Sequence, residues 1–233
     1  MKIAIFNEFI HERTEEKIKA IYPDGIHAVL KSFLENEDTE VEVITLDNHE
    51  ELLTPEHLET IDVLLWWGHA GHPKVTDEAA IAVRDAVHTG MGFIPLHSAH
   101  HSKPFKLLMG TPCNLSWRAD DHEIVWTVDP SHPIAQGVGR YFEIDEEMYG
   151  EPFSIPEPDK LVFIGRFAGG EVFRSGCCFQ RGNGKIFYFQ PGHESCPTYY
   201  NETVQRIIKN AVNWVKPTYR QVIECPHVEP VIK

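Results

Sequence analysis

The chain has few basic residues and lacks a long hydrophobic run. Lys and Arg number 21 against 35 Asp and Glu, so the net charge is -14 at pH 7 with His neutral. Because phosphate groups are bound by basic patches, this balance argues against nucleic acid and anionic membranes as partners. No apolar run approaches the roughly 20 residues that a membrane-spanning helix needs. The opening run MKIAIFNEF also lacks the apolar core and cleavage site of a signal peptide, so we expect a cytoplasmic protein.

Two classes of motif are also missing: paired cysteines and glycine-rich phosphate loops. The chain has 5 cysteines, an odd number, and none are spaced as CxxC, so we expect reduced thiols. Cys177 and Cys178 are adjacent in a strand-like run, and their side chains should therefore lie on opposite faces. The first predicted strand is followed by Asn7-Glu8-Phe9 instead of GxGxxG or a P-loop. We therefore expect neither a nicotinamide nor a nucleotide cofactor.

Histidine, by contrast, is abundant. The chain has 14 histidines, and many of them follow apolar runs in short polar loops. Imidazole titrates near neutral pH and is a common metal ligand. The composition therefore suits a metal site or acid/base chemistry, although a simple surface position explains most of the 14 histidines.

The first half of the chain alternates apolar runs with segments of helical periodicity. Strands are predicted at residues 2–6, 41–46, 61–67 and 92–97, and helices at about 15–36, with a break near 23–25, and at 76–89. Thr76 is placed to cap the second helix and Gly90 to end it. This order predicts a doubly wound α/β fold with a mostly parallel sheet.

The second half of the chain is mainly strands with short connections. These are predicted at residues 123–128, 140–144, 160–165, 171–180 and 185–190, before a closing helix at 199–215. Short connections favour antiparallel additions to the sheet. We expect one domain over residues 1–217 and a tail over 218–233. Exposed aromatic residues and the tail favour a homo-oligomer.

Polar residues gather at one predicted edge of the sheet. Ligands of open α/β sheets bind beyond the carboxyl ends of the strands. Three strand ends carry histidine, and two carry glycine, which allows a backbone to approach a ligand. The polar residues at these ends are Asn7, Glu8, His69, His72, His97, Ser98, His100, His101, His193 and Glu194. The pattern predicts a functional site at this edge.

Four segments taken together resemble the ThuA-like, trehalose-utilisation family. They are GFIPLHSAHH at 92–101, HPIAQGV at 132–138, IDEEMYGEPF at 144–153 and GKIFYFQPGHE at 184–194. The resemblance extends from about Lys2 to Trp214. It implies a flavodoxin-like fold similar to that of the class I glutamine amidotransferases.

The resemblance also implies where this chain departs from the amidotransferases. Their nucleophile elbow matches Ser98, where those enzymes have cysteine, and their catalytic histidine matches His193. Serine in place of the thiol argues against glutamine hydrolysis through a thioester. Leu96 and His100 would crowd a tight elbow, and the acid expected two residues after the histidine is Ser195. A Ser-His-Glu triad therefore cannot be transferred directly.

The ThuA-like pattern implies a different set of site residues. They are His97, Ser98, His132, Glu147, Tyr149 and His193. Glu147 and Tyr149 are two residues apart, so on an extended segment they face the same way and could serve as base and acid. Simple packing of Tyr149 and a structural turn at His132-Pro133 are the alternatives. We assign catalytic roles to His193, Glu147, Ser98 and Tyr149.

Metal and substrate groups complete the predicted site. His69 and His72 form a His-x-x-His pair, and we expect a divalent metal, zinc first, on His69, His97 and His193. Substrate contacts are assigned to His97, His132, Trp117 and Glu8. An aromatic ring such as that of Trp117 could stack on a sugar.

Three functions are compatible with these residues. The first is a sugar-processing enzyme in which a base removes a proton next to the carbonyl of a keto-sugar and a metal or Ser/His donors stabilise the enolate. The second is a hydrolase in which His193 activates Ser98. The third is a non-catalytic sugar-binding or regulatory protein. Fold alone does not choose among them.

Overall fold

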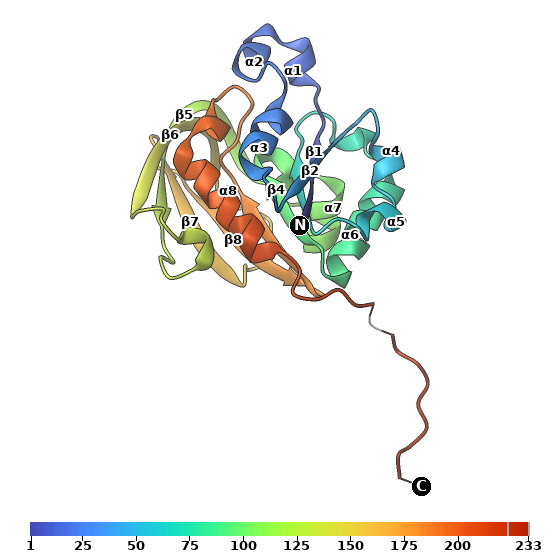
Figure 1. The fold of residues 1–233 in the computed structure, drawn as a ribbon. Helices are drawn as coiled ribbons and strands as arrows, with labels where there is room; N and C mark the ends of the chain where they lie inside the picture. The colour runs from blue at the N-terminus through green and yellow to red at the C-terminus, as the bar shows by residue number, and fades with distance from the viewer. Residues whose placement is uncertain (223, 233) are drawn as a thin grey trace.

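A single mixed sheet forms the centre of the computed structural model, which describes residues 1–222 and 224–232 (Figure 1). The sheet has nine strands in the order β2-β1-β3-β4-β9-β8-β7-β5-β6 among the described residues. The strands are β1 Lys2–Asn7, β2 Glu40–Thr45, β3 Val63–Trp67, β4 Gly92–Leu96, β5 Ser116–Thr127, β6 Tyr141–Gly150, β7 Lys160–Phe167, β8 Val172–Arg181 and β9 Gly184–Phe189.

The sheet changes from parallel to antiparallel pairing at β9. Strands β2, β1, β3, β4 and β9 pair in parallel, whereas β9, β8, β7, β5 and β6 pair antiparallel. This confirms the predicted α/β fold with antiparallel additions in the second half. No helix in the described ranges is long and apolar enough to cross a membrane.

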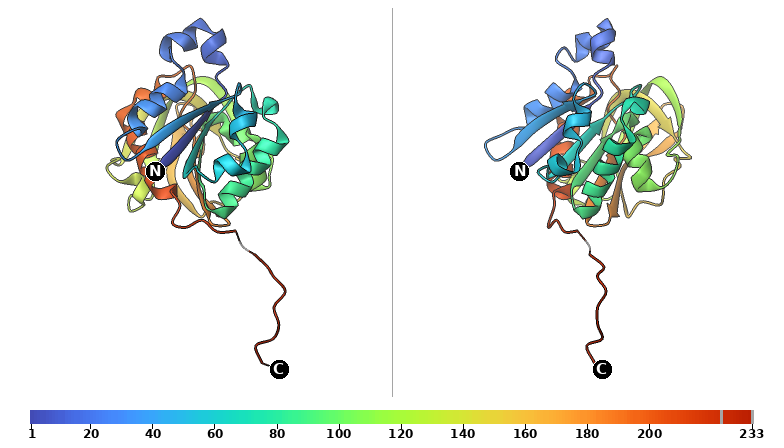
Figure 2. Two further views of the ribbon diagram at one scale, coloured as in Figure 1. Left: turned by 45° about the vertical axis from the view of Figure 1, so that its right-hand side comes forward. Right: turned by 90° about the vertical axis from the view of Figure 1, so that its right-hand side faces the viewer.

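Helices cover both faces of the sheet, as the turned views show (Figure 2). The described α-helices are α1 His11–Thr14, α2 Glu16–Ile21, α3 Ile26–Leu34, α4 His49–Leu52, α5 Pro55–Leu58, α6 Asp77–Thr89, α7 Lys103–Met109 and α8 Glu202–Val215. Helices α3 and α8 pack into one hydrophobic core, and α6 and α7 pack into the other. Cys178 lies in the first core and Cys177 in the second, which confirms that the two thiols face opposite sides.

Local signals explain the helix boundaries. The Thr76 hydroxyl accepts a hydrogen bond from the Ala79 N–H at the start of α6, and the helix ends at Gly90, whose φ is 130°. The chain breaks between α2 and α3 at residues 22–25, close to the predicted position. Such capping and glycine termination follow directly from side-chain and backbone chemistry.

The middle of the chain differs from the prediction. Strand β5 begins at Ser116, seven residues before the predicted start, and β6 continues to Gly150. The early part of β5 is polar and mostly exposed, so it carries no alternating apolar pattern. Its pairing with β6, from Ser116 opposite Gly150, forms the extension. After β4 a short 3-10 helix occupies His97–His101, and α7 follows from Lys103.

Candidate functional site

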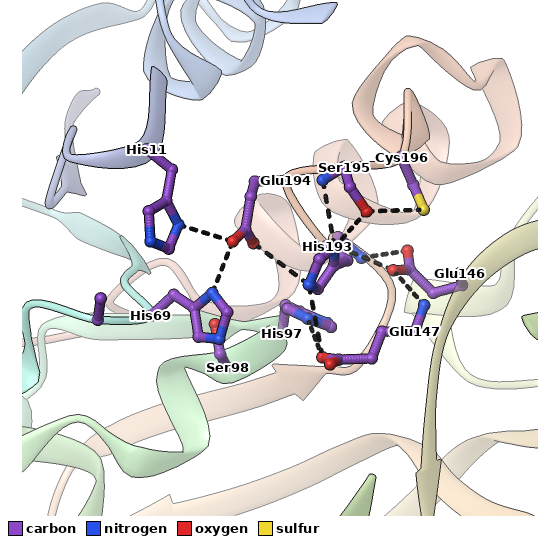
Figure 3. Close-up of polar contacts among 12 residues, drawn as sticks. His11, His69, His97, Ser98, Glu146, Glu147, His193, Glu194, Ser195 and Cys196 are labelled. Atoms are coloured by element: carbon purple, nitrogen blue, oxygen red, sulfur yellow. Dashed lines mark hydrogen bonds and ion pairs between the residues drawn. The ribbon is translucent and has the colours of Figure 1, made fainter. Parts of the chain in front are cut away.

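A pocket of about 510 Å³ lies where β1, β3, β4 and β9 end. This is the edge at which ligands of α/β sheets bind. Segments far apart in the sequence meet there, and the close-up shows their polar side chains converging (Figure 3). The pocket is lined by residues that include His11, His69, His72, Ser98, His100, His101, Trp117, Glu147, Tyr149, His193 and Glu194.

His97, Glu147 and His193 form the first polar cluster of the site. The Nδ1–H of His97 donates to the Gln190 carbonyl over 2.8 Å, and its Nε2 lies 3.1 Å from Glu147 Oε2. The Tyr149 ring stacks on the His97 ring at 4.8 Å between centroids. Both nitrogens of His97 are therefore engaged, and its ring is fixed in a buried position.

Charge pairing sets the protonation of this cluster. Burial alone would lower the pKa of His97, but the carboxylates of Glu147 and Glu146 outweigh it and raise the pKa to about 9. Burial alone would raise the pKa of Glu147, but the hydrogen bond and charge of His97 outweigh that effect and lower it. At neutral pH the pair is therefore an imidazolium beside a carboxylate.

His193 presents its Nε2 to the pocket. The Ser195 N–H donates to His193 Nδ1 over 3.2 Å, and the Ser195 hydroxyl lies 2.7 Å from the same nitrogen. Because Nδ1 accepts, the neutral ring carries its proton on Nε2. That nitrogen lies 3.8 Å from Glu147 Oε2 and 3.7 Å from Glu194 Oε2. Burial, reinforced by the charge of His97, lowers the pKa of His193 and favours the neutral form.

Glu146 holds the loop that carries His193. Its buried carboxylate accepts hydrogen bonds from the N–H groups of Gly192 and His193 over 2.7 and 2.9 Å. The Thr198 hydroxyl donates to it over 2.8 Å. Gly192 has φ 143°, and a Cβ atom there would lie 2.1 Å from the Tyr199 hydroxyl. The turn therefore requires glycine, and Glu146 fixes it in place.

His11, His69 and Glu194 form the second polar cluster. Glu194 Oε1 lies 2.7 Å from His11 Nδ1 and 2.6 Å from His69 Nδ1. The hydrogen bond to Glu194 raises the pKa of His11. Burial alone would raise the pKa of Glu194, but its contacts with the two histidines outweigh this and lower it strongly. The two clusters meet where Glu194 Oε2 approaches the His193 ring.

Glu8 was predicted to contact substrate, and the structure gives it a different place. Its buried carboxylate accepts the N–H groups of His69, Ala70 and Gly71 over 2.6, 2.9 and 2.7 Å. Because both oxygens are used on backbone donors, Glu8 shapes the loop after β3 instead of lining the pocket. It positions His69 for its contact with Glu194.

His132 also lies elsewhere than predicted. It caps the short helix at Pro133–Ala135 by accepting the Ile134 N–H, and its ring lies 5.1 Å from that of Trp214. It is absent from the described residues that line the pocket. The structural alternative for the His132-Pro133 turn therefore holds, and the predicted substrate contact is corrected to a capping role.

Trp117 does lie in the pocket wall and is 67% exposed. Its ring faces solvent at the mouth because it belongs to the polar start of β5. The neighbouring wall contains His72, His100 and His101. Burial lowers the pKa of His72 to about 3, and it also lowers the pKa values of His100 and His101. The mouth thus combines an aromatic plane with neutral imidazoles.

The strained residue at the end of β4 is His97, with φ 50°. In a nucleophile elbow the nucleophile itself occupies the strained strand-to-helix turn. Ser98 follows it, and its hydroxyl donates to the Gly68 carbonyl over 2.7 Å. In the described ranges no hydrogen bond joins the Ser98 hydroxyl to a histidine. The elbow position therefore belongs to His97, one residue before the predicted Ser98.

The three predicted metal ligands are divided between the two clusters. His69 contacts Glu194, whereas His97 and His193 lie with Glu147. The rings of His69 and His97 flank that of His193 at centroid distances of 5.7 and 5.2 Å. His69 contacts Glu194 and His97 contacts Glu147, so the three predicted ligands belong to two separate groups of possible metal ligands.

Sequence reasoning missed His11, Glu146 and the contacts of Glu194. His11 follows β1 at the same sheet edge as the other histidines, and that position was its available signal. Glu146 alternates with Glu147 on β6 and faces the other way, toward the β9 loop. Its role depends on a contact 47 residues along the chain, which local pattern does not reveal.

Comparisons with known proteins agree with this architecture. The family described as "Trehalose utilisation", ThuA, matches residues 2–215. No curated protein matches the sequence significantly. A ThuA-like protein from Parabacteroides merdae aligns with TM-score 0.68 and 14% identity over 94% of this chain and 92% of its own.

Two further solved structures share the fold. A cytoplasmic protein from Salmonella typhimurium aligns with TM-score 0.59 and 14% identity over 93% of this chain and 100% of its own. The PurLQS structure from Thermotoga maritima aligns with TM-score 0.55 and 12% identity over 91% of this chain and 98% of its own. The fold is thus that of ThuA-like and amidotransferase-like proteins. With the family match covering nearly the whole chain, the protein belongs to the ThuA family.

Proposed function

We propose that this protein is an enzyme of carbohydrate utilisation that removes the proton next to the carbonyl group of an oxidised sugar. The observation that carries the proposal is the pairing of Glu147 Oε2 with His193 Nε2 across 3.8 Å at the pocket wall. A carboxylate base facing a neutral imidazole is an arrangement suited to carbonyl–enolate chemistry. The family's description, trehalose utilisation, supports a carbohydrate substrate.

Glu147 is the base in this proposal. His97 lies 3.1 Å from Glu147 Oε2 and is itself held by the Gln190 carbonyl, so the carboxylate has a fixed direction. When Glu147 takes the proton, the electrons of the C–H bond form the enolate double bond and the carbonyl oxygen gains negative charge. A fixed base avoids the reorganisation that a mobile side chain would need.

His193 stabilises that oxygen. Its Nδ1 is occupied by Ser195, so its Nε2–H is the donor available to the substrate. A donor aimed at the developing oxyanion lowers the barrier most when it is already in position. Trp117, at the mouth of the pocket, offers an exposed aromatic ring on which a sugar ring can stack. The Tyr149 ring stacks on that of His97.

Deuterium wash-in tests the proposal directly. Trehalose oxidised chemically to a keto-disaccharide is incubated with the enzyme in D2O, and proton NMR follows the position next to the carbonyl. We expect the enzyme to accelerate exchange well above the buffer rate. Binding of the keto-disaccharide without faster exchange would contradict the proposal and favour a non-catalytic sugar-binding protein.

The hydrolase alternative predicts a reactive Ser98, and the geometry argues against it. The Ser98 hydroxyl donates to the Gly68 carbonyl, so we expect a fluorophosphonate probe to leave Ser98 unlabelled. Ser98→Ala should keep exchange within a few-fold of the wild-type rate and lower the free energy of unfolding by about 1 kcal/mol through loss of one hydrogen bond. Covalent labelling of Ser98, detected by mass spectrometry, would restore the alternative.

A further inference from the structure

We propose that His11, His69 and Glu194 bind one divalent metal ion, zinc by the chemistry of the ligands, at the side of the pocket away from Glu147. The inference does not depend on the proposed proton transfer. Two imidazoles and one carboxylate form a ligand set that zinc uses in catalytic sites, where a fourth position stays open for water or substrate. The ligand set differs from the His69, His97 and His193 expected from the sequence.

The donor atoms of the three side chains converge on one point. One ligand atom from each of His11, His69 and Glu194 lies within 4.8 Å of the other two. They come from three separate segments, after β1, β3 and β9. In Figure 3 the dashed lines from His11 and His69 meet at the same carboxylate oxygen of Glu194. Ligand atoms from three distant segments thus lie close enough together to share one metal ion.

Glu194 adds a second, independent observation. Its side chain is 3% exposed, and its Oε2 atom is buried without a hydrogen-bond partner among the described residues. A buried carboxylate with an unpaired oxygen is costly unless a charge compensates it. His193 Nε2 lies 3.7 Å from this oxygen, which is too far for a hydrogen bond. A cation would compensate this charge.

The surroundings hold the ligands in place. Glu8 fixes the backbone of residues 69–71 through three hydrogen bonds, so the His69 ring is presented from a rigid loop. Glu146 fixes the backbone at Gly192 and His193, immediately before Glu194. The backbone that presents His69 and Glu194 is therefore held in place before any ion binds.

The distances also indicate how the cluster must change when a metal ion binds. Tetrahedral zinc with ligands at roughly 2.0–2.1 Å places neighbouring ligand atoms about 3.3 Å apart. The contacts of Glu194 Oε1 with His11 and His69 are 2.7 and 2.6 Å, as expected for protons shared between these groups. Metal binding would replace those protons and widen the cluster slightly, and so would release protons to the solvent.

Isothermal titration calorimetry with zinc chloride tests the site on untagged protein that has been stripped with chelator. We expect one zinc ion per chain and release of protons, seen as a dependence of the heat on buffer ionisation. Glu194→Gln and His69→Asn should each weaken binding by about 100-fold or more, since even outer groups are worth 10–100-fold. The side chain of His69 is 37% exposed, so His69→Asn tests the site without disturbing a buried group.

Two matched variants locate the ion. His101→Gln removes a pocket histidine outside the cluster, and Glu147→Gln alters the other cluster; both should bind zinc within about threefold of the wild type. Cobalt substitution should add a visible absorption band that Glu194→Gln removes.

The proposal is overturned if zinc binds at less than one ion per chain, if Glu194→Gln and His69→Asn bind normally, or if Glu147→Gln loses binding as Glu194→Gln does. Because calorimetry needs no sugar, absence of deuterium exchange leaves this result unaffected.

Discussion

Glu147→Gln should slow deuterium wash-in by about 10²–10⁴-fold, the usual contribution of a general base. Glutamine keeps an oxygen for His97 but cannot accept a proton at physiological pH. His193→Ala should cause a similar loss, because the oxyanion then lacks its donor. The measurement is the first-order exchange rate by NMR at saturating keto-disaccharide.

His101→Gln is the control for this experiment. It lines the same pocket, but its ring lies beside Asn114 and forms no hydrogen bond with Glu147 or His193 among the described residues. We therefore expect exchange near the wild-type rate. Circular dichroism and thermal melting would verify that each variant is folded. Glu147→Gln and His193→Ala enzymes that both exchange at more than a tenth of the wild-type rate would show that this pair does not transfer the proton.

Glu146→Ala should lower the free energy of unfolding by about 3 kcal/mol or more. The change leaves the N–H groups of Gly192 and His193 and the Thr198 hydroxyl without their common acceptor in a buried position. Each buried donor left unpaired costs about 1–3 kcal/mol. Urea denaturation followed by tryptophan fluorescence measures the difference.

Glu143→Ala on the same strand is the matched control. Its carboxylate is exposed and pairs with exposed His122, so its loss should change stability by about 0.5 kcal/mol or less. Equal stability losses for the two variants would show that the buried hydrogen bonds of Glu146 contribute no more to stability than an exposed ion pair does. A selective loss for Glu146→Ala would tie the stability of the β9 loop to the placement of His193.

The strand ends were predictable because apolar runs stop where the chain leaves the sheet. That rule placed His69, His97 and His193 at one edge, and alternation along an extended segment placed Glu147 and Tyr149 together. Glu147 and Tyr149 both line the pocket in the structure. The exposed start of β5 was not predictable in this way, because its residues form a strand only through pairing with β6.

The detailed chemistry of the site depended on contacts that local pattern does not contain. Glu8 was predicted to contact substrate because it follows β1. Its carboxylate instead accepts hydrogen bonds from the loop after β3. The left-handed backbone of His97 is rare for a residue with a side chain and is imposed by the packed surroundings. The grouping of His11 with Glu194 spans 183 residues and follows only from the assembled sheet.

The adjacent thiols on β8 provide a pair of native reporters for the two sides of the molecule. Cys177 contacts the core beneath α6 and α7, and Cys178 contacts the core beneath α8. Burial raises the pKa of Cys177 to about 12 and also raises the pKa of Cys178, so neither thiol reacts readily while its layer stays closed. Alkylation rates at the two sulfurs would therefore distinguish opening of one helical layer from opening of the other, from neighbouring positions on a single strand.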